Sequence, residues 1–214
     1  CLVGSEMCIR DRFNINLNIF IRTILLTFSF LWFTYLGTKI GEDYVAANAI
    51  LINLVFLSAF ILDAYAFSTE GIVGYSLGKK DLTLFKNIVR NSFILSSISG
   101  LIISIIFFFT NNFVINFMSD IDEIRMLSSS YVIWLIILPV ISSFCYQFDG
   151  IFIGASQTKE LRNAMIFSVL VYLLISIFLI KFLFNTGIWI SLCIFVILRA
   201  ISLFWYLNRI YLRF

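Results

Sequence analysis

Six apolar stretches, each near the length of a membrane-spanning helix, dominate this sequence and limit what it can fold into. A helix of about twenty residues is about 30 Å long, which matches the hydrocarbon thickness of a bilayer. Transmembrane strands are excluded because the stretches lack polar and apolar alternation. We therefore expect an all-α integral membrane protein, a six-transmembrane-helix bundle with these spans: 19–36, 45–67, 93–109, 131–153, 164–184 and 188–207.

The composition agrees with lipid as the main solvent and argues against several functional classes. Of 214 residues, 61% are hydrophobic and 13% are charged, whereas soluble domains are about half apolar and a quarter charged. The net charge of +3 is too small and too dispersed for a nucleic-acid surface. The chain has no His and no recognisable catalytic or metal-binding motif. We expect membrane lipids as partners, no enzyme activity, no metal site, no cofactor and no nucleic acid.

The first residues, CLVGSEMCIRDR, mix charged and small side chains and differ from everything that follows. This string is similar to translated sequencing-adapter read-through, so we expect residues 1–12 to be non-native. The transmembrane lobe is then expected to occupy residues 13–214, as a fragment of a longer protein.

The basic residues predict how the spans are oriented, because short cytoplasmic loops are rich in Lys and Arg. Only three basic residues, Lys39, Arg125 and Lys181, belong to one side. We therefore expect both termini and the second and fourth connections to face the cytoplasm. Eight basic residues follow spans two, four and six on that side: Lys79, Lys80, Lys86, Arg90, Lys159, Arg162, Arg209 and Arg213.

Two carboxylates lie along the second span, which is expected to continue in helical register to Leu77. Asp63 and Glu70 are seven residues apart and so share one helical face. A carboxylate within a span costs about 2.5 to 3.5 kcal/mol on insertion scales and normally faces a protein interior or a cavity. Asp63 is therefore the leading candidate for transport or ion coupling, with a bond to a neighbouring helix as the alternative. Glu70 is a second candidate for which a structural role is favoured, and Asn48 and Asn53 are candidates to line a cavity.

The fourth span contains the only proline, Pro139, which removes a helical hydrogen bond and favours a kink. Tyr146, Gln147 and Asp149 follow within one helical turn, an arrangement that would place a phenol, an amide and a carboxylate on one cavity wall. Asp149 is a further candidate for transport or coupling, and Pro139, Tyr146 and Gln147 are candidates to line the cavity. The alternative is that the helix leaves the membrane at Asp149.

Two arginines, Arg22 and Arg199, lie well inside apolar runs. We expect both to extend their guanidinium groups to the membrane surface, and the alternative for Arg199 is a salt bridge to Glu70. Trp189 lies near a span end and is expected to anchor its helix at the membrane interface.

Several segments resemble the second half of a multidrug and toxic compound extrusion (MATE) transporter, in particular the DinF-like branch. They are NIFIRTILL, AANAILINLVFLSAFILDAYAFSTEGIVGYSLGKKD, YQFDGIFIGASQTKELRNAM and GIWISLCIFVILRAISLFW. The resemblance implies a twelve-helix fold in two halves, in the bacterial inner (plasma) membrane, that exports organic, often cationic, compounds by antiport with protons or sodium ions. The positions that match the family pattern are Asp63, Glu70, Gly74, Gly78, Asp149, Gly150, Gly154 and Arg162.

One departure from the family pattern concerns the coupling ion. NorM-like relatives carry an acidic cation ligand in the first helix of this half, whereas the first span here has no Asp or Glu. The resemblance therefore implies that the coupling acid belongs to the missing N-terminal six-helix half, a required partner. Two other functions stay open: a flippase for lipid-linked precursors from the same superfamily, and a membrane scaffold subunit that transports nothing.

Overall fold

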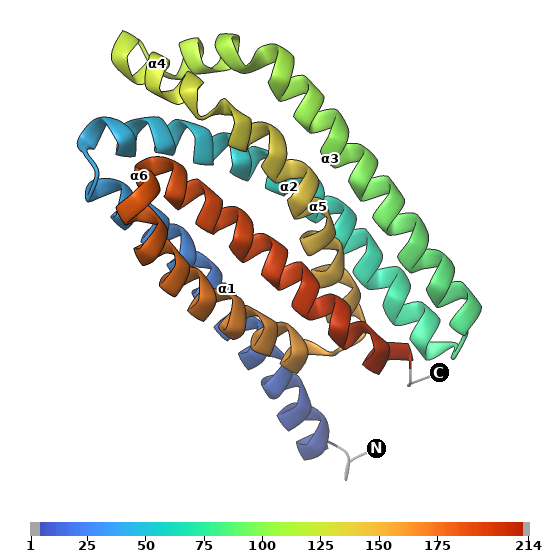
Figure 1. Ribbon diagram of the computed structural model, residues 1–214. Coiled ribbons are helices and arrows are strands. Elements are labelled where there is room, and N and C mark those ends of the chain that lie inside the picture. Colours follow the sequence, from blue (N-terminus) through green and yellow to red (C-terminus); the bar gives the residue numbers. More distant parts are fainter. Residues whose placement is uncertain (1–4, 212–214) are drawn as a thin grey trace.

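The computed structural model describes residues 5–211 and is helical almost throughout (Figure 1). Residues 1–4 and 212–214, including Arg213, lie outside that description. Five helices of the described part are long and apolar enough to cross a membrane, and one is short. The helices are α1 (Ser5–Thr38), α2 (Glu42–Gly78), α3 (Leu82–Met118), α4 (Asp122–Ser130), α5 (Val132–Gly154) and α6 (Thr158–Tyr211).

Helix α6 is a hairpin of two legs. Its 54 residues would form a rod of about 81 Å, far longer than a bilayer is thick. At Phe184 the backbone leaves the helical conformation, with φ 48° and ψ −130°, and Figure 1 shows the orange and red legs lying back on one another. Gly187 permits this reversal because a Cβ at that position would collide with the backbone of Leu179. Counted as a first leg (158–183) and a second leg (185–211), α6 supplies the fifth and sixth predicted spans.

Helices α2 and α3 extend well beyond the apolar runs that predicted them. Each has 37 residues, or about 55 Å, so each must tilt or protrude from a hydrocarbon layer of about 30 Å. The predicted continuation of the second span past Phe67 is confirmed. Helix α3 begins eleven residues before the apolar run at Phe93 and is capped by Asp81, whose carboxylate accepts a hydrogen bond of 2.8 Å from the Leu84 N–H.

The polar segment after the third span is more ordered than the sequence predicted. Residues 110–130 were expected to form a connection, but α3 continues to Met118 and α4 follows after a short turn. Arg125 holds this turn by donating hydrogen bonds to the carbonyl oxygens of Asn116 and Ser119. Apolar content does not reveal such a helix, because its stability comes from bonds to a neighbouring turn.

Two apolar clusters fill the interior of the bundle. The larger one surrounds Trp189, Tyr172 and Phe33, and the smaller one surrounds Phe85 and Phe152. Trp189 is 0% exposed, so the prediction that it anchors a helix at the membrane interface is wrong. The helices pack mainly around α5, whose neighbours are α2, α3 and α6.

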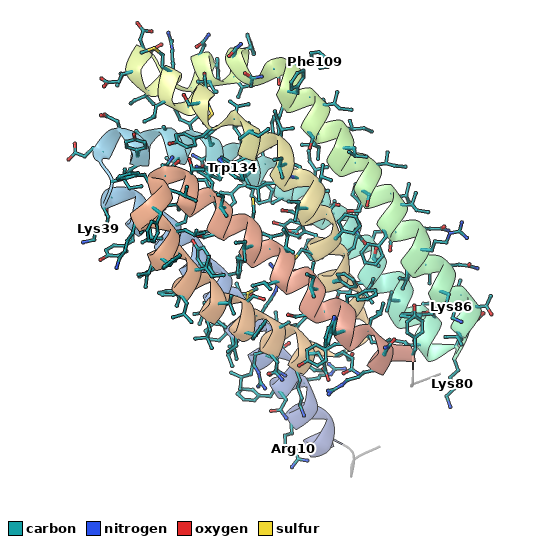
Figure 2. All side chains as sticks on the ribbon, in the orientation of Figure 1. Arg10, Lys39, Lys80, Lys86, Phe109 and Trp134 are labelled. Carbon is teal, nitrogen blue, oxygen red and sulfur yellow. The ribbon has the colours of Figure 1, made fainter. Side chains whose placement is uncertain are left out.

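The outer surface of the bundle is strongly apolar. Phe60, Phe109 and Phe117 are 73%, 78% and 86% exposed, and Figure 2 shows Phe109 on the outside of α3. A soluble protein rarely exposes so much contiguous apolar surface. Lipid chains, rather than water, are the solvent that this surface fits.

The ends of the described chain lie on the same side of the bundle. Figure 1 places N and C at the end where the α2–α3 turn and the α5–α6 connection also lie, and the Phe184 turn and α4 lie at the opposite end. Figure 2 shows Arg10, Lys80 and Lys86 at the first end and Lys39 at the other. The predicted alternation of the connections is confirmed, and which end faces the cytoplasm stays a prediction.

Candidate functional site

A buried carboxylate between two arginines lies inside the bundle. One oxygen of Asp149, on α5, accepts hydrogen bonds from Arg22 on α1 and from Arg199 on the second leg of α6. The side chains of Asp149, Arg199 and Arg22 are 4%, 5% and 15% exposed. The prediction that both arginines reach the membrane surface is therefore wrong. Asp149, rather than Glu70, is the salt partner of Arg199, and Asp149 does not mark an exposed helix end.

Close contact between α2 and α5 brings a fourth charge near this group. Gly150 directly follows Asp149, and a Cβ at Gly150 would collide with the backbone of Ala66 on α2. One turn later, Gly154 lies equally close to the backbone of Glu70. Two glycines four residues apart let helix backbones approach closely, an arrangement common between membrane helices.

The fourth charge is Asp63, which is half-buried on α2. Its carboxylate interacts electrostatically with Asp149, Arg22 and Arg199. Within residues 5–211 it forms no hydrogen bond or ion pair of its own. We call Arg22, Asp63, Asp149 and Arg199 the four-charge cluster; its formal charges, two positive and two negative, sum to zero.

The residues of α5 predicted to line a cavity have different surroundings, and whether Tyr146 and Gln147 line one cavity with Asp149 stays a prediction. Gln147 is buried and accepts a hydrogen bond of 2.9 Å from the Thr69 hydroxyl on α2. Tyr146 is half-buried and packs against the larger apolar cluster. Pro139 is buried and removes one helical hydrogen bond from α5. Close to this position, the Ser104 hydroxyl on α3 donates a hydrogen bond of 2.6 Å to the Ile136 carbonyl.

The polar residues predicted near the other end of α2 have mixed outcomes. Asn48 is buried, and its side-chain amide forms two hydrogen bonds with that of Asn185, of 2.6 and 3.0 Å. The side-chain oxygen of Asn48 also accepts a hydrogen bond of 2.9 Å from the Trp189 indole N–H. Asn48 and the exposed Asn53 both line a cavity of about 110 Å³ between α1 and α2. Glu70 is half-buried, and its backbone lies against Gly154 of α5.

Three residues of these networks were missed or misjudged from the sequence. Arg22 and Arg199 were placed at the membrane surface, although a charged group inside an apolar run normally has a buried partner. Asn185 was assigned to a polar connection, and nothing in its local sequence indicates that it pairs with Asn48. The partners lie 127, 50 and 137 residues away along the chain.

Comparison with known proteins gives a consistent family. Residues 19–179 match the family described as MatE. The chain is 32% identical over 189 residues to the DNA damage-inducible protein F of Escherichia coli (strain K12). These residues make up 88% of this chain and 41% of that protein. The matched family region includes Arg22, Asp63 and Asp149 but not Arg199.

Two solved structures share the fold. A crystal structure of MATE in complex with MaL6 superposes with a TM-score of 0.86 at 15% identity, covering 98% of this chain and 48% of the other. The structure of an outward-facing multidrug resistance MATE family transporter of the MOP superfamily superposes with a TM-score of 0.79 at 19% identity. This match covers 89% of this chain and 43% of the other. The chain therefore spans about half the length of these proteins. From the family match, the E. coli relative and the shared helical fold, we conclude that this chain belongs to the MatE family of membrane transporters.

Proposed function

We propose that this chain is the C-terminal lobe of a secondary active transporter that exports organic, drug-like compounds in exchange for protons or sodium ions. Family membership supports the transport class. The four-charge cluster is the observation that supports ion coupling within this lobe. The lobe works together with a second half, which supplies the rest of the substrate pathway, and lipids surround both.

The electrostatics of the cluster support a functional role. Removing an ion from water costs several kcal/mol, and well-packed apolar residues often stabilise a protein as well as a buried ion pair does. The arginines and Asp149 join α1, α5 and α6, while Asp63, on α2, has no bonded partner within the described part of the chain. This geometry leaves Asp63 free to take a coupling ion.

Neutralising Asp63 changes the charge balance of the whole cluster. A proton or a sodium ion bound there removes one negative charge, so the formal sum becomes +1. Arg22 is the more exposed of the two arginines and is the one that can move away from Asp149 at least cost. Ion binding at α2 would thus loosen the bond between α1 and α5, a route from ion uptake to helix movement.

The alternative functions require different features. A flippase for lipid-linked precursors needs a wide basic surface, whereas both arginines of the four-charge cluster are bonded to Asp149. A scaffold subunit needs no coupling, so substitutions in the cluster would change its stability without changing any flux.

The test replaces Asp63 in the two-lobe protein, expressed in bacteria that lack their own drug pumps. Asp63→Asn is expected to reduce the uptake of a fluorescent organic cation into inverted vesicles by at least tenfold. Asp43→Asn is the matched control, because Asp43 is an exposed acid at the start of the same helix. Imposing a proton gradient or a sodium gradient alone identifies the coupling ion.

The outcomes are distinct. Normal gradient-driven uptake by the folded Asp63→Asn protein would remove Asp63 from the coupling mechanism. Failure of the unmodified two-lobe protein to transport any compound under either gradient would count against the transporter and favour the scaffold.

A further inference from the structure

A polar cavity lies at the end of the lobe where the two ends of the chain lie. The beginning of α1 and the connection from α5 to α6 form it, and Figure 1 places both segments at this end. Its volume is about 440 Å³, and seven of its eight lining side chains carry a polar group, the exception being Ile15. A space of this size and polarity holds on the order of ten water molecules.

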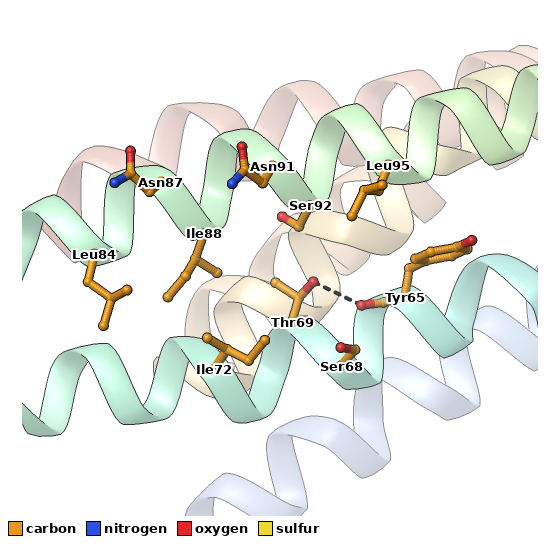
Figure 3. A pocket seen from close by; sticks show the side chains of 10 residues that line it. All are labelled: Tyr65, Ser68, Thr69, Ile72, Leu84, Asn87, Ile88, Asn91, Ser92 and Leu95. Atoms are coloured by element: carbon orange, nitrogen blue, oxygen red, sulfur yellow. Dashed lines mark hydrogen bonds between the residues drawn. The ribbon is translucent and has the colours of Figure 1, made fainter.

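The groove between α2 and α3 is of a different kind. Figure 3 shows three apolar side chains in the space between these helices, those of Ile72, Leu84 and Ile88. The amides of Asn87 and Asn91 point away from α2 in the same view. This groove therefore gives water no continuous row of hydrogen-bonding partners. Of these two spaces, the polar cavity beside α1 is the one that suits water.

The buried side chain of Asn18 lies at the inner end of the polar cavity, because it is the lining residue of α1 farthest from the start of that helix. Its amide nitrogen donates a hydrogen bond of 3.2 Å to the Thr158 hydroxyl. Its amide oxygen accepts a hydrogen bond of 2.9 Å from Arg162. Thr158 and Arg162 are four residues apart and lie on one face of the first leg of α6. Asn18 therefore joins two helices where the cavity ends.

The four-charge cluster begins one helical turn beyond Asn18. Arg22 follows Asn18 by four residues, so the two side chains share a face of α1 and are about 6 Å apart along its axis. On α5, Asp149 precedes Ser156, a lining residue of the cavity, by seven residues, or about 10 Å. Both helices therefore place Asn18 and its bonded partners between the cavity and the cluster.

We propose that the polar cavity is an aqueous passage between the four-charge cluster and the water at this end of the lobe, and that Asn18 opens and closes its inner end. The proposal rests on the function proposed above, in which Asp63 takes a coupling ion. An amide suits this position because it bonds both helices when they are together and bonds water when they part. In the predicted orientation this end is cytoplasmic, so an exporter driven by an entering ion releases the ion here.

The first experiment measures whether water reaches position 18, and it does not require transport. The two-lobe protein, with its native cysteines replaced, is placed in lipid nanodiscs and treated with a charged methanethiosulfonate, which reacts with the ionised thiol. We expect Asn18→Cys to react about tenfold faster than Phe20→Cys. Phe20 is the matched control because it is only two residues further along α1 but lies on the apolar outer surface, 61% exposed. Asn14→Cys, at an exposed position in the cavity lining, should react fastest.

The second experiment separates control of a passage from simple joining of the helices. Asn18→Leu and Asn18→Ser both remove the bonds to Thr158 and Arg162, so a purely structural role predicts the same loss of uptake in both variants. A passage predicts that Asn18→Leu, which adds an apolar side chain of similar size, slows gradient-driven uptake about tenfold. Asn18→Ser leaves space and a hydroxyl for water, and should keep uptake close to that of the unmodified protein.

A block applied after folding covers the case in which Asn18→Leu folds poorly. A bulky maleimide attached to Asn14→Cys in the folded protein should slow uptake about tenfold, because it fills the polar cavity. The same reagent should leave uptake by the cysteine-free protein unchanged.

Three results would overturn the proposal: equal reactivity of Asn18→Cys and Phe20→Cys, equal uptake by the leucine and serine variants, or full uptake after the block at position 14. These results are distinct from a failure of the proposed function. If the unmodified protein transports nothing, the transporter proposal and the role of the passage fall together, and labelling still decides whether position 18 is hydrated. If transport is normal and position 18 does not react, only the passage is refuted.

Discussion

Asp149 holds two positive charges inside the bundle. Its carboxylate bonds Arg22 and Arg199, which come from opposite ends of the sequence. Such a group has two separable effects, because it stabilises the guanidinium groups and also joins three helices. Loss of one partner from a buried ion pair is far more costly than replacing the whole group with apolar residues.

We therefore predict that Asp149→Asn lowers the free energy of unfolding by about 3 to 5 kcal/mol, since two buried guanidinium groups lose their counter-charge. Adding Arg199→Met to this variant should recover part of the loss, because it removes one of the uncompensated charges. Unfolding in SDS titrations, followed by tryptophan fluorescence, gives the free energies. Additive losses in the double variant would show that the two side chains do not interact in the folded protein.

At the scale of the elements, the contact between α2 and α5 depends on glycine. The sequence GIFIG places Gly150 and Gly154 on one face of α5, against the α2 backbone at Ala66 and Glu70. Lipid provides no hydrophobic drive for helices to associate, so close backbone packing must supply much of the attraction. This contact also sets how far Asp63 lies from Asp149.

Gly150→Ala is expected to lower the free energy of unfolding by about 1 to 3 kcal/mol, because the new methyl group forces the two helices apart. Gly71→Ala is the matched control: Gly71 lies in α2, and a methyl group added there would meet no other atom within 4 Å. That control should be neutral or stabilising by up to about 1 kcal/mol, since Gly weakens a helix interior. Equal effects of the two substitutions would contradict the close α2–α5 contact.

The α6 hairpin gives a second prediction at this scale. Phe184 has a positive φ of 48°, a conformation that costs a bulky residue about 1 to 2 kcal/mol. Its side chain is 66% exposed, so Phe184→Gly should remove the strain and raise the free energy of unfolding by about 0.5 to 1 kcal/mol. Phe182→Gly, at a helical position that is 65% exposed, should instead lower it by about 1 kcal/mol. The same SDS titration measures both, and destabilisation by both would refute the sharp turn.

For the whole molecule, the bundle places every second connection at the same end. That end carries most of the basic residues, and the opposite end carries Lys39, Arg125 and Lys181. Positively charged loops are retained in the cytoplasm during membrane insertion. The charge distribution and the arrangement of the helices together predict a single orientation.

Cysteine labelling in intact cells tests this orientation in the two-lobe protein with its native cysteines replaced. Lys86→Cys should resist a membrane-impermeant maleimide until the cells are opened, because the predicted orientation places the start of α3 in the cytoplasm. Asp120→Cys should react in intact cells, because Asp120 is exposed in the turn between α3 and α4 at the opposite end. The reverse labelling pattern would invert the orientation.

The sequence by itself determined the helical spans, the extension of α2 beyond Phe67, the break before Ile188 and the alternation of the connections. Each of these depends on hydrophobicity summed over neighbouring residues, a local property. Helical periodicity also indicated that Asp63 and Glu70 share a face, but not what that face meets.

Only the tertiary structure decided which polar groups bond one another. Arg22 and Arg199 looked like residues that reach the membrane surface, and Trp189 looked like an interfacial anchor, yet all three lie in buried networks. The reason is that their partners are 127, 50 and 141 residues distant along the chain. A local pattern records that a polar group in lipid needs a partner, whereas helix packing alone decides which partner comes within reach.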